Sequence, residues 1–514
     1  MPLLCLLAVI GAFLGYPNPW LHLPPLMLLF PAALCLMAFR ATSQWRALGW
    51  SYLTSVLALT ACLYWVAGPV AQYGGLPWWL ALPCPFGVSL VMGLYGGAFG
   101  WGMHRAARRF PPLLLCIFAG ILWTALEQTG SWLFSGFPWV TLSVAFAPWP
   151  LFIQGASLVG AYGLSGLFVS IVAGLLLWNT ARPPRHLALF LCIFLLGFGC
   201  YRMAGYAPSG LDKHVALIQG NIDQAEKWEA PFQIGTVQKY IDMSRESLIP
   251  TVPATGTTTA SSNANQPDLI VWPETAMPFY LQDASVYSNQ VSEFVRTSGV
   301  PLIAGAPAYM QQEDGSFNFY NRAFLFNPHD DSVSWYDKVH LVPFGEYVPL
   351  KEWLPVDKLA SGVGDYLPGD RLAPLNADGM HLGLLICYEA IFPELAQERV
   401  ARGADILVNI SNDAWFGRSS APWQHLAQTR MRAVEQSRWI ARGTNTGVSA
   451  FIDPLGRLAA SSELFQDQVL TWTVKPVQVT TIYHDAYHWL TSGAYLLAGL
   501  LFSLTLLCPA LRRP

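Results

Sequence analysis

The sequence YDKVHLVPFGEYVP at Tyr336–Pro349 places Lys338 eight residues before Glu346, at the end of an expected strand. Two other strand ends also carry reactive groups. Glu274 follows the hydrophobic strand that ends in Val271-Trp272, and Cys387 ends the buried strand that precedes Tyr388-Glu389. Short apolar runs followed by such groups are typical of strands in a covered sheet. These three strand ends decide the fold and the chemistry expected for the C-terminal half.

Glutamate, lysine and cysteine form a complete set for acyl chemistry. A thiolate attacks an acyl carbon, a carboxylate moves protons, and an ammonium neutralises the oxyanion. A helix expected to begin in 390–397 would favour the Cys387 thiolate through its dipole and its free N–H groups. Taken singly, Glu274 could be a helix cap, Lys338 a surface cation and Cys387 a core residue. Their joint occurrence in these contexts predicts an active site.

Around these motifs, short apolar segments expected to be strands alternate with segments that have the spacing of helices. This alternation indicates one α/β domain over 211–488. One helix is expected at Ala421–Arg438, with an apolar face. Thr251–Gln266 is polar and of low complexity, and is predicted to be a surface loop. Strands are expected at His214–Asn221, Asp268–Trp272, Val300–Gly305, Ala323–Asn327, Leu382–Ile386 and Asp405–Asn409, and the helix face comprises Trp423, Leu426, Thr429 and Val434.

The composition divides the chain into two parts. Of its 514 residues, 53% are hydrophobic and 12% are charged, whereas soluble domains carry about 25% charged residues. Residues 1–210 contain one acid, Glu127, eight arginines and no lysine, whereas 211–488 hold 31 acidic and 19 basic residues. Neither part offers the basic stripe that nucleic acid requires, so a nucleic-acid partner is excluded.

The first part reads as a transmembrane domain of about seven helices over 1–210, and 489–514 adds a C-terminal helix and its end. Each span requires about 20 apolar residues. Residues 3–39 are interrupted by five prolines and are predicted to form two short spans. The remaining spans are expected at Tyr52–Ala71, Trp78–Gly102, Pro112–Leu126, Leu151–Trp178, Leu187–Gly205 and Trp489–Cys508.

The basic residues predict the orientation. Under alternating threading, all the basic loops fall on one side, and the loops at 68–77 and 127–150 contain no Lys or Arg. Basic loops are cytoplasmic, so domain 211–488 is expected on the other side, the periplasm, with the chain in the bacterial inner membrane. The cations concerned are Arg40, Arg46, Arg105, Arg108, Arg109, Arg182, Arg185, Arg512 and Arg513.

The motifs W-P-E-T at 272–275, the stretch at 336–349 and C-Y-E at 387–389 resemble the carbon–nitrogen hydrolase (nitrilase) superfamily. That resemblance implies a nitrilase-like αββα sandwich with a Glu–Lys–Cys triad. With seven spans before the domain and one after it, the whole chain resembles the apolipoprotein N-acyltransferases. The implied catalytic residues are Glu274, Lys338 and Cys387, with Glu346, Tyr388 and Glu389 supporting them, and Trp228 and Trp415 as candidates to line a substrate entrance.

The resemblance also implies a ping-pong reaction without cofactor or metal. Glu274 takes the Cys387 proton, and the thiolate attacks an ester of a membrane phospholipid, expected to be the sn-1 chain of phosphatidylethanolamine. Lysophospholipid leaves a thioester, which the α-amine of a diacylglyceryl apolipoprotein converts to an amide. We expect the chain to act as a monomer.

Two other functions stay open at this point. One is a membrane-tethered amidase or nitrilase that releases ammonia from a small substrate. The other is a membrane receptor or transport subunit with a degenerate nitrilase-like domain, although Glu274, Lys338 and Cys387 are all intact. No G-x-S-x-G elbow and no phosphate-binding loop occur, which disfavours a serine lipase and a nucleotide-driven pump.

Overall fold

The computed structural model describes residues 1–207, 210–224, 227–249, 266–283, 286–330, 332–349 and 365–507, in two compact units. Unit 1 comprises Met1–Tyr206, Ser419–Gln436 and Thr480–Pro514, and unit 2 comprises Ala207–Arg418 and Ser437–Val479. Residues 419–436, which the sequence analysis placed inside the soluble domain, therefore pack with unit 1. The predictions for 251–265, Cys508, Arg512 and Arg513 lie outside the described residues.

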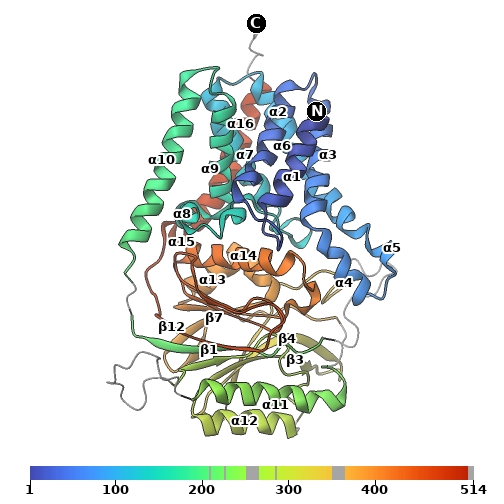
Figure 1. Ribbon diagram of the computed structural model, residues 1–514, viewed down its shortest axis with the longest axis vertical. Coiled ribbons are helices and arrows are strands. Elements are labelled where there is room, and N and C mark those ends of the chain that lie inside the picture. Colours follow the sequence, from blue (N-terminus) through green and yellow to red (C-terminus); the bar gives the residue numbers. More distant parts are fainter. Residues whose placement is uncertain are drawn as a thin grey trace. The chain divides into compact units, whose positions relative to one another are not determined.

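Unit 1 is helical (Figure 1). Its helices are α1 (Pro2–Gly15), η1 (Pro24–Leu28), α2 (Leu29–Arg40), α3 (Gln44–Cys62), η2 (Tyr64–Val66), α4 (Ala67–Gln72), α5 (Trp78–Ala81), α6 (Cys84–Ala107), α7 (Pro112–Thr129), η3 (Leu133–Ser135), η4 (Leu142–Phe146), α8 (Pro150–Ile153), α9 (Ala156–Leu176), α10 (Arg182–Gly205), α14 (Ala421–Gln436), α15 (Ile482–Asp485) and α16 (Tyr487–Leu507).

Within the described chain, five segments are long and apolar enough to cross a membrane: 78–107, 112–129, 156–176, 182–205 and 487–507. A sixth is the pair 44–62 and 64–72, which is bent by 59°. The expected span over 52–71 therefore starts earlier and is broken, and the one expected over 151–178 begins as the separate short helix α8. The two short spans expected in 3–39 are the apolar helices Pro2–Gly15 and Pro24–Arg40, which are shorter than the others.

Asn18 explains how the chain can be irregular after α1. Its amide nitrogen donates to the carbonyls of Phe13, Tyr16 and Leu21, at 2.8–3.0 Å. Its oxygen accepts from the backbone N–H groups of Trp20 and Leu21. Non-helical backbone at membrane depth persists only where its polar groups find partners inside the protein. One side chain thus replaces the helical hydrogen bonds that the prolines remove.

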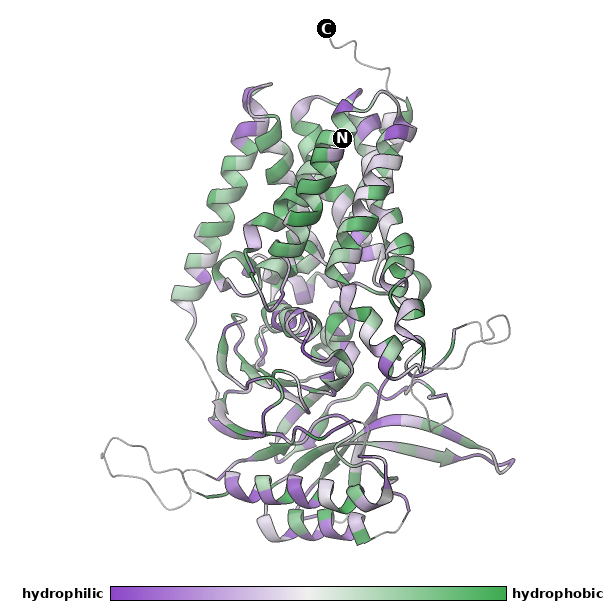
Figure 2. Ribbon diagram, turned by 45° about the vertical axis from the view of Figure 1, so that its right-hand side comes forward, coloured by the Kyte–Doolittle hydropathy of each residue, from purple (hydrophilic) through white to green (hydrophobic). Residues whose placement is uncertain are grey.

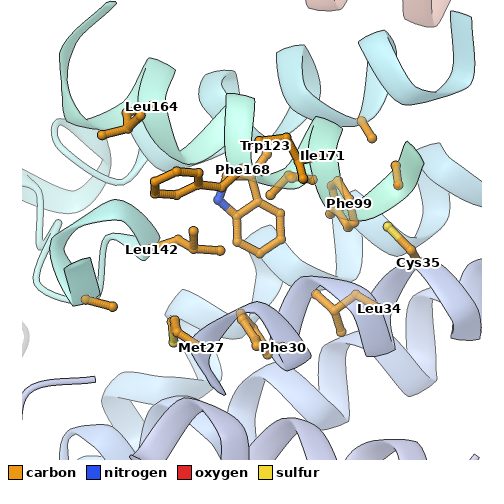
Figure 3. Close-up of a cluster of buried hydrophobic side chains, with 14 of the residues drawn as sticks. Met27, Phe30, Leu34, Cys35, Phe99, Trp123, Leu142, Leu164, Phe168 and Ile171 are labelled. Carbon is orange, nitrogen blue, oxygen red and sulfur yellow. The ribbon is translucent and has the colours of Figure 1, made fainter. Parts of the chain in front are cut away.

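Apolar side chains from distant helices fill the centre of unit 1. Figure 3 shows Trp123 between Phe99 and Phe30, with ring centroids 5.0 and 5.9 Å away. Figure 2 shows hydrophobic residues along the bundle helices, and hydrophilic residues around the connections at one end. There, Arg105 donates to Gln44 and Arg108 to the Ala41 carbonyl. The basic connections after α2 and α6 therefore lie together.

Helix α14 of unit 1 confirms the helix expected at 421–438. Of its expected face, Leu426, Thr429 and Val434 are buried, whereas Trp423 is exposed. Polar side chains of α14 are buried as well, because they bind residues at the ends of other helices and in the loops of unit 1. Gln424 Oε1 accepts from the indoles of Trp65 (3.0 Å) and Trp139 (2.7 Å). Its nitrogen donates to the carbonyls of Pro17 and Cys62, the latter at the end of α3.

Unit 2 contains two six-stranded sheets. The first has the order β12-β1-β2-β3-β4-β5, and the second has the order β11-β10-β9-β8-β7-β6. The strands are β1 (Lys213–Gln219), β2 (Leu269–Val271), β3 (Leu302–Gln311), β4 (Phe317–Phe326), β5 (Val333–Asp337), β6 (Leu375–Ala377), β7 (Met380–Ile386), β8 (Ile406–Ser411), β9 (Ile440–Thr444), β10 (Ala450–Ile452), β11 (Leu458–Ser461) and β12 (Gln468–Val474). All six expected strands are present: β1, β2, β7 and β8 agree within two residues at each end, whereas β3 ends six residues later and β4 begins six residues earlier than expected.

Strand alternation builds the layers of unit 2. In β1, Val215 and Leu217 face the second sheet, while Ala216 and Ile218 face α11 (Ala230–Ser247) and α12 (Val286–Ser298). Figure 1 shows these two helices side by side on one face of the first sheet. Helix α13 (Pro393–Ala401) packs on the second sheet through β7. This is the expected αββα sandwich. It forms because successive side chains of a strand point to opposite faces of the sheet, and both faces are covered.

Candidate active site

The three reactive residues follow strands whose directions bring their ends together. Strand β2 is parallel to β3, and two antiparallel pairings make β5 run the same way as both. Glu274 and Lys338 therefore leave the first sheet at one edge. Cys387 follows β7, which is parallel to β8 in the second sheet. The carboxyl ends of parallel strands are where α/β sheets place their ligands.

Glu274 is 7% exposed, and both of its oxygens are held. Oε1 accepts a hydrogen bond from Asn321 Nδ2 at 2.7 Å, and Oε2 accepts one from the Asn412 backbone N–H at 2.8 Å. Lys338 Nζ lies 3.8 Å from Oε1. A carboxylate fixed on both sides, with a cation beside it, is suited to accept and return a proton at a defined position.

The Lys338 ammonium is 1% exposed and is anchored by Glu346. Lys338 Nζ lies 3.0 Å from Glu346 Oε1 and 2.9 Å from Oε2. Burial alone lowers the pKa of Lys338, but the charges of Glu346, Glu274 and Cys387 raise it above its ordinary value. Lys338 is therefore a permanent cation, and both carboxylate oxygens of Glu346 contact its ammonium group.

Asn321, in β4, was missed by the sequence analysis. Its Nδ2 donates to both Glu274 Oε1 and Glu346 Oε1, at 2.7 Å each. The carbonyl of Asn321 accepts from the Lys338 N–H at 2.9 Å. No motif marked this residue, and the only available signal was a polar Asn-Arg pair just before an apolar stretch. Asn321 links the two carboxylates and sets the start of the Lys338 segment.

Cys387 follows β7 on a single 3₁₀ turn, η5 (Cys387–Ile391), with φ +51°. Helix α13 begins only at Pro393. This start lies within the expected range 390–397, and the turn η5 separates α13 from the thiol. Burial, and then the charge of Glu274, raise the pKa of Cys387, while Lys338 opposes them. The resting group is therefore a thiol that faces a carboxylate.

Glu389 connects the backbone near the nucleophile to the backbone near the lysine. Its Oε2 accepts from the Ile386 N–H at 2.7 Å, and Oε1 accepts from the Val339 N–H and the Tyr336 hydroxyl at 2.8 Å each. Burial raises the pKa of Glu389, and Arg399 opposes that rise. Glu389 thus links the backbone just before Cys387 to the backbone just after Lys338.

The aromatic residues of the prediction lie in different settings. Tyr388 is buried and makes an edge contact with Phe392 at 5.0 Å. Trp228 is 39% exposed and lies on the loop after β1. Trp415 is half-buried in the 3₁₀ turn η6 (Asp413–Phe416), directly after Asn412. The structure brings Glu274, Lys338, Glu346 and Cys387 together, with Tyr388 and Glu389 on the adjoining turn.

Two family models match the chain. The carbon-nitrogen hydrolase model matches residues 214–483, and the model of the apolipoprotein N-acyltransferase N-terminal domain matches residues 10–175. An apolipoprotein N-acyltransferase from Geobacter metallireducens is 35% identical over 97% of this chain and 95% of its own length. The chain belongs to the apolipoprotein N-acyltransferase family. An Azotobacter vinelandii apolipoprotein N-acyltransferase is 33% identical, over 95% of this chain and 92% of its own.

Solved structures similar to this family member include nitrilase-superfamily proteins. An amidase from a Nesterenkonia species is 19% identical, and the match covers 56% of this chain and 99% of the amidase, with a TM-score of 0.39. A Saccharomyces cerevisiae member of branch 10 of the superfamily is 18% identical over 55% of this chain and 95% of its own, with a TM-score of 0.39.

This apolipoprotein N-acyltransferase family member also needs a glycine beside the site. A Cβ on Gly305, in β3, would lie 2.7 Å from both the Glu274 Cα and the Thr275 nitrogen. Both atoms belong to the backbone and have no freedom to move aside. Gly305 therefore lets β3 approach the turn that carries Glu274. The sequence analysis named Gly305 only as the end of a strand.

Proposed function

We propose that this chain transfers an acyl chain from a membrane glycerophospholipid to the N-terminal α-amine of diacylglyceryl apolipoproteins, through a thioester on Cys387. The relationship to apolipoprotein N-acyltransferases over nearly the whole chain supports the substrates. The observation that carries the chemistry is the charged set around Cys387. Its thiol interacts with the Glu274 carboxylate and with the Lys338 ammonium, which lie 3.8 Å apart.

In the first half-reaction, Glu274 takes the Cys387 proton as the sulfur attacks the ester carbonyl. The C–O bond to the glycerol then breaks, and Glu274 returns the proton to the departing lysophospholipid oxygen. Because the resting thiol has a raised pKa, the proton leaves only when a substrate is there to take the electron pair. Base and nucleophile act as one unit.

Lys338 has the task of stabilising the tetrahedral oxyanion, together with a backbone N–H on the turn near Tyr388. Because Glu346 and Asn321 already fix the positions of Lys338 and Glu274, little reorganisation is needed when charge develops. Such preorganised charge contributes several kcal/mol in sites shielded from water, where one oxyanion donor is worth about 3 kcal/mol.

In the second half-reaction, the α-amine of the apolipoprotein attacks the thioester carbonyl. The C–S bond breaks, the sulfur regains a proton through Glu274, and the product is an amide. An amide is more stable than a thioester, so the step needs no external energy source. Glu274 and Cys387 thus exchange a proton in both half-reactions, in opposite directions.

The chain is a multi-pass membrane protein. We place it in the bacterial inner membrane with residues 211–488 on the periplasmic side, and we expect a monomer. The support is the arginine distribution. Within unit 1, the connections that follow Arg40 and Arg105 lie together, as the contacts of Arg105 and Arg108 show, and basic connections are cytoplasmic.

Mass analysis of the Cys387 peptide after incubation with defined phospholipid alone tests this function. The expected result is a fatty acyl adduct on Cys387, followed by its loss and acylation of an added diacylglyceryl lipopeptide. The Cys387→Ala variant inserts into membranes and transfers nothing. A small-substrate amidase, which the relatives do not favour, would release ammonia and show no adduct with phospholipid. Activity that survives in Cys387→Ala would remove the mechanism.

A further inference from the structure

A hydrophobic groove lies between α3 and α6 of unit 1. The two helices pack along each other (Figure 1), and the groove has a volume of about 340 Å³. It is lined by Leu48, Leu94 and Ala98, and by Trp45 and Trp101 where α3 begins and α6 ends, next to the basic connections. Small-molecule sites usually have volumes of about 300–1,000 Å³. The groove therefore has room for part of an amphiphilic molecule.

The groove lies on a surface that faces lipid. Leu94 is 55% exposed and Trp45 is 66% exposed, and both belong to segments that are apolar enough to cross a membrane. Along α6, Leu94 lies two turns, about 10 Å, from Trp101. Tryptophans are enriched where a membrane meets water. An occupant can therefore place an apolar chain beside Leu94 while its polar part stays between the two tryptophans.

Two hydrogen-bond donors at this end of the groove have no acceptor in the described part of the chain. They are Nε1 of Trp101 and Nε of Arg105, and both are shielded from water. The Arg105 guanidinium lies over the Trp101 ring, 5.6 Å from its centre, and donates to Gln44 Oε1 at 2.8 Å. Buried N–H groups in native proteins are nearly always paired. Trp101 and Arg105 can therefore both donate to an acceptor that is not part of this chain.

The positive charge at this end is not balanced by the chain. Among the described residues, no carboxylate lies within 4.0 Å of Arg46 or Arg105, and their side chains donate to neutral groups. Residues 1–126 contain no Asp or Glu. The first acid, Glu127, lies near the far end of α7, about 22 Å along the helix from the basic connection. Clustered arginines at a membrane surface attract anionic lipids.

We propose that the groove between α3 and α6 binds one anionic phospholipid, with its phosphate against Arg105 and the Trp101 indole and one acyl chain beside Leu94 and Ala98. A phosphate supplies both the negative charge and the acceptor oxygens, and a guanidinium pairs well with it. With the orientation proposed above, this lipid belongs to the cytoplasmic leaflet.

This lipid is not the acyl donor. The groove belongs to unit 1, whereas Cys387 and the charged residues around it belong to unit 2. The lipid is expected to stabilise the helical bundle, because a ligand that binds only the folded state shifts the unfolding equilibrium toward that state. The inference therefore goes beyond the proposed function and does not depend on acyl transfer.

The test uses the full-length Cys387→Ala protein in detergent, which cannot form a thioester with the added lipid. Native mass spectrometry counts the lipids that the protein retains as the concentration of phosphatidylglycerol, which is anionic, or of phosphatidylethanolamine, which has no net charge, is raised. The variants are Arg105→Gln, Trp101→Phe and Ala98→Phe, each made in this background.

Arg185→Gln is the matched control. Arg185, near the start of α10, also lies over a tryptophan ring, that of Trp178, at 5.6 Å. It therefore has the same local contact as Arg105 and belongs to another basic connection of unit 1.

We expect the parent protein and the Arg185→Gln control to retain one phosphatidylglycerol with the same affinity. Arg105→Gln and Trp101→Phe should each weaken its binding about tenfold, because each removes one hydrogen bond to a charged group. Ala98→Phe should prevent binding, because the larger side chain fills the groove. Phosphatidylethanolamine should bind more weakly than phosphatidylglycerol, and added salt should reduce the difference.

Three results would overturn the inference. Equal weakening by Arg105→Gln and Arg185→Gln would mean that any arginine at this end attracts anionic lipid. Equal affinities for the two lipids would mean that the headgroup charge is not recognised. Unchanged binding in Ala98→Phe would mean that the lipid does not occupy the groove. An unchanged thermal transition in lipid-free detergent shows that a variant is folded, and Arg105→Gln and Trp101→Phe decide the question if Ala98→Phe does not fold.

Discussion

Replacing Asn321 with leucine removes the one amide that binds both carboxylates of the site. Asn321 Nδ2 donates to Glu274 Oε1 and to Glu346 Oε1, at 2.7 Å each. Leucine has nearly the same shape, so the packing within β4 is kept while both donors disappear. Glu274 then keeps one hydrogen bond, from the Asn412 N–H, and can rotate away from the thiol.

The size of the effect follows from these two hydrogen bonds. A hydrogen bond to a charged group contributes about 1.5–3 kcal/mol, so the pair contributes about 3–6 kcal/mol to holding the site. If half of this reaches the barrier, 1.5–3 kcal/mol corresponds to a slowing of about 10- to 150-fold at 1.36 kcal/mol per tenfold. The Lys338 ammonium retains Glu346, so the loss should not be total.

The assay is single-turnover formation of the Cys387 thioester with phospholipid in excess, quenched and analysed by mass. Asn318→Leu is the control, since Asn318 lies on the same strand, is partly exposed, and its side chain has no hydrogen-bond partner among the described residues. Aspartate at 321 should be slower still, because it adds a third carboxylate beside one lysine. A wild-type rate in a folded Asn321→Leu enzyme would refute the reasoning.

Two further substitutions and one labelling experiment test the surrounding structure. Gly305→Ala should slow thioester formation at least tenfold, because the added Cβ would lie 2.7 Å from backbone atoms. The control Gly235→Ala, which has open space around it, should keep the wild-type rate. Equal rates in the two variants would contradict the close approach of β3 to the Glu274 turn. Glu389→Gln should lower the free energy of unfolding by about 1–3 kcal/mol, because the new NH2 group would face a backbone N–H donor. The variant should therefore unfold at a lower temperature than the control Glu398→Gln. An unchanged unfolding temperature would argue against the hydrogen bonds given to Glu389. The rate of iodoacetamide labelling of Cys387 should keep rising with pH above about pH 9, because burial and Glu274 raise the pKa of this thiol. The labelling rate of an ordinary thiol, with a pKa of about 8.5, levels off there. A rate that levels off near pH 8 would show that the resting group is a thiolate.

The sequence predicted the strand ends well because a buried strand is a local apolar run and its reactive residue follows directly. Glu274, Lys338 and Cys387 were found in this way, and the αββα layers agree with the resemblance. Asn321 was missed because its role depends on Glu274 and Glu346, which lie 47 and 25 residues away along the chain. The expectation of a favoured Cys387 thiolate did not take into account burial and the charge of Glu274, which raise the pKa of the thiol.

Helix α14 shows the same limit of sequence-based prediction. Its helical spacing could be recognised in the sequence, but the residues that surround it could not. Gln424 is an ordinary polar residue in the sequence. In unit 1, however, its amide accepts hydrogen bonds from two indoles and donates to two carbonyls. Its partners come from Pro17, Cys62, Trp65 and Trp139, which no local pattern could connect to residue 424.

By itself, the sequence determined which segments are apolar enough for membrane helices, where the covered strands end, and which nucleophile, acid–base group and cation follow them. Periodicity and hydrophobicity are local properties, and a single chain displays them. Only the tertiary structure decided the charge state of each reactive group and its hydrogen-bond partners. Burial and the electric field of distant charges set those properties, and both arise when remote strands meet: Lys338 is buried, yet it stays a cation because Glu346 and Glu274 lie beside it.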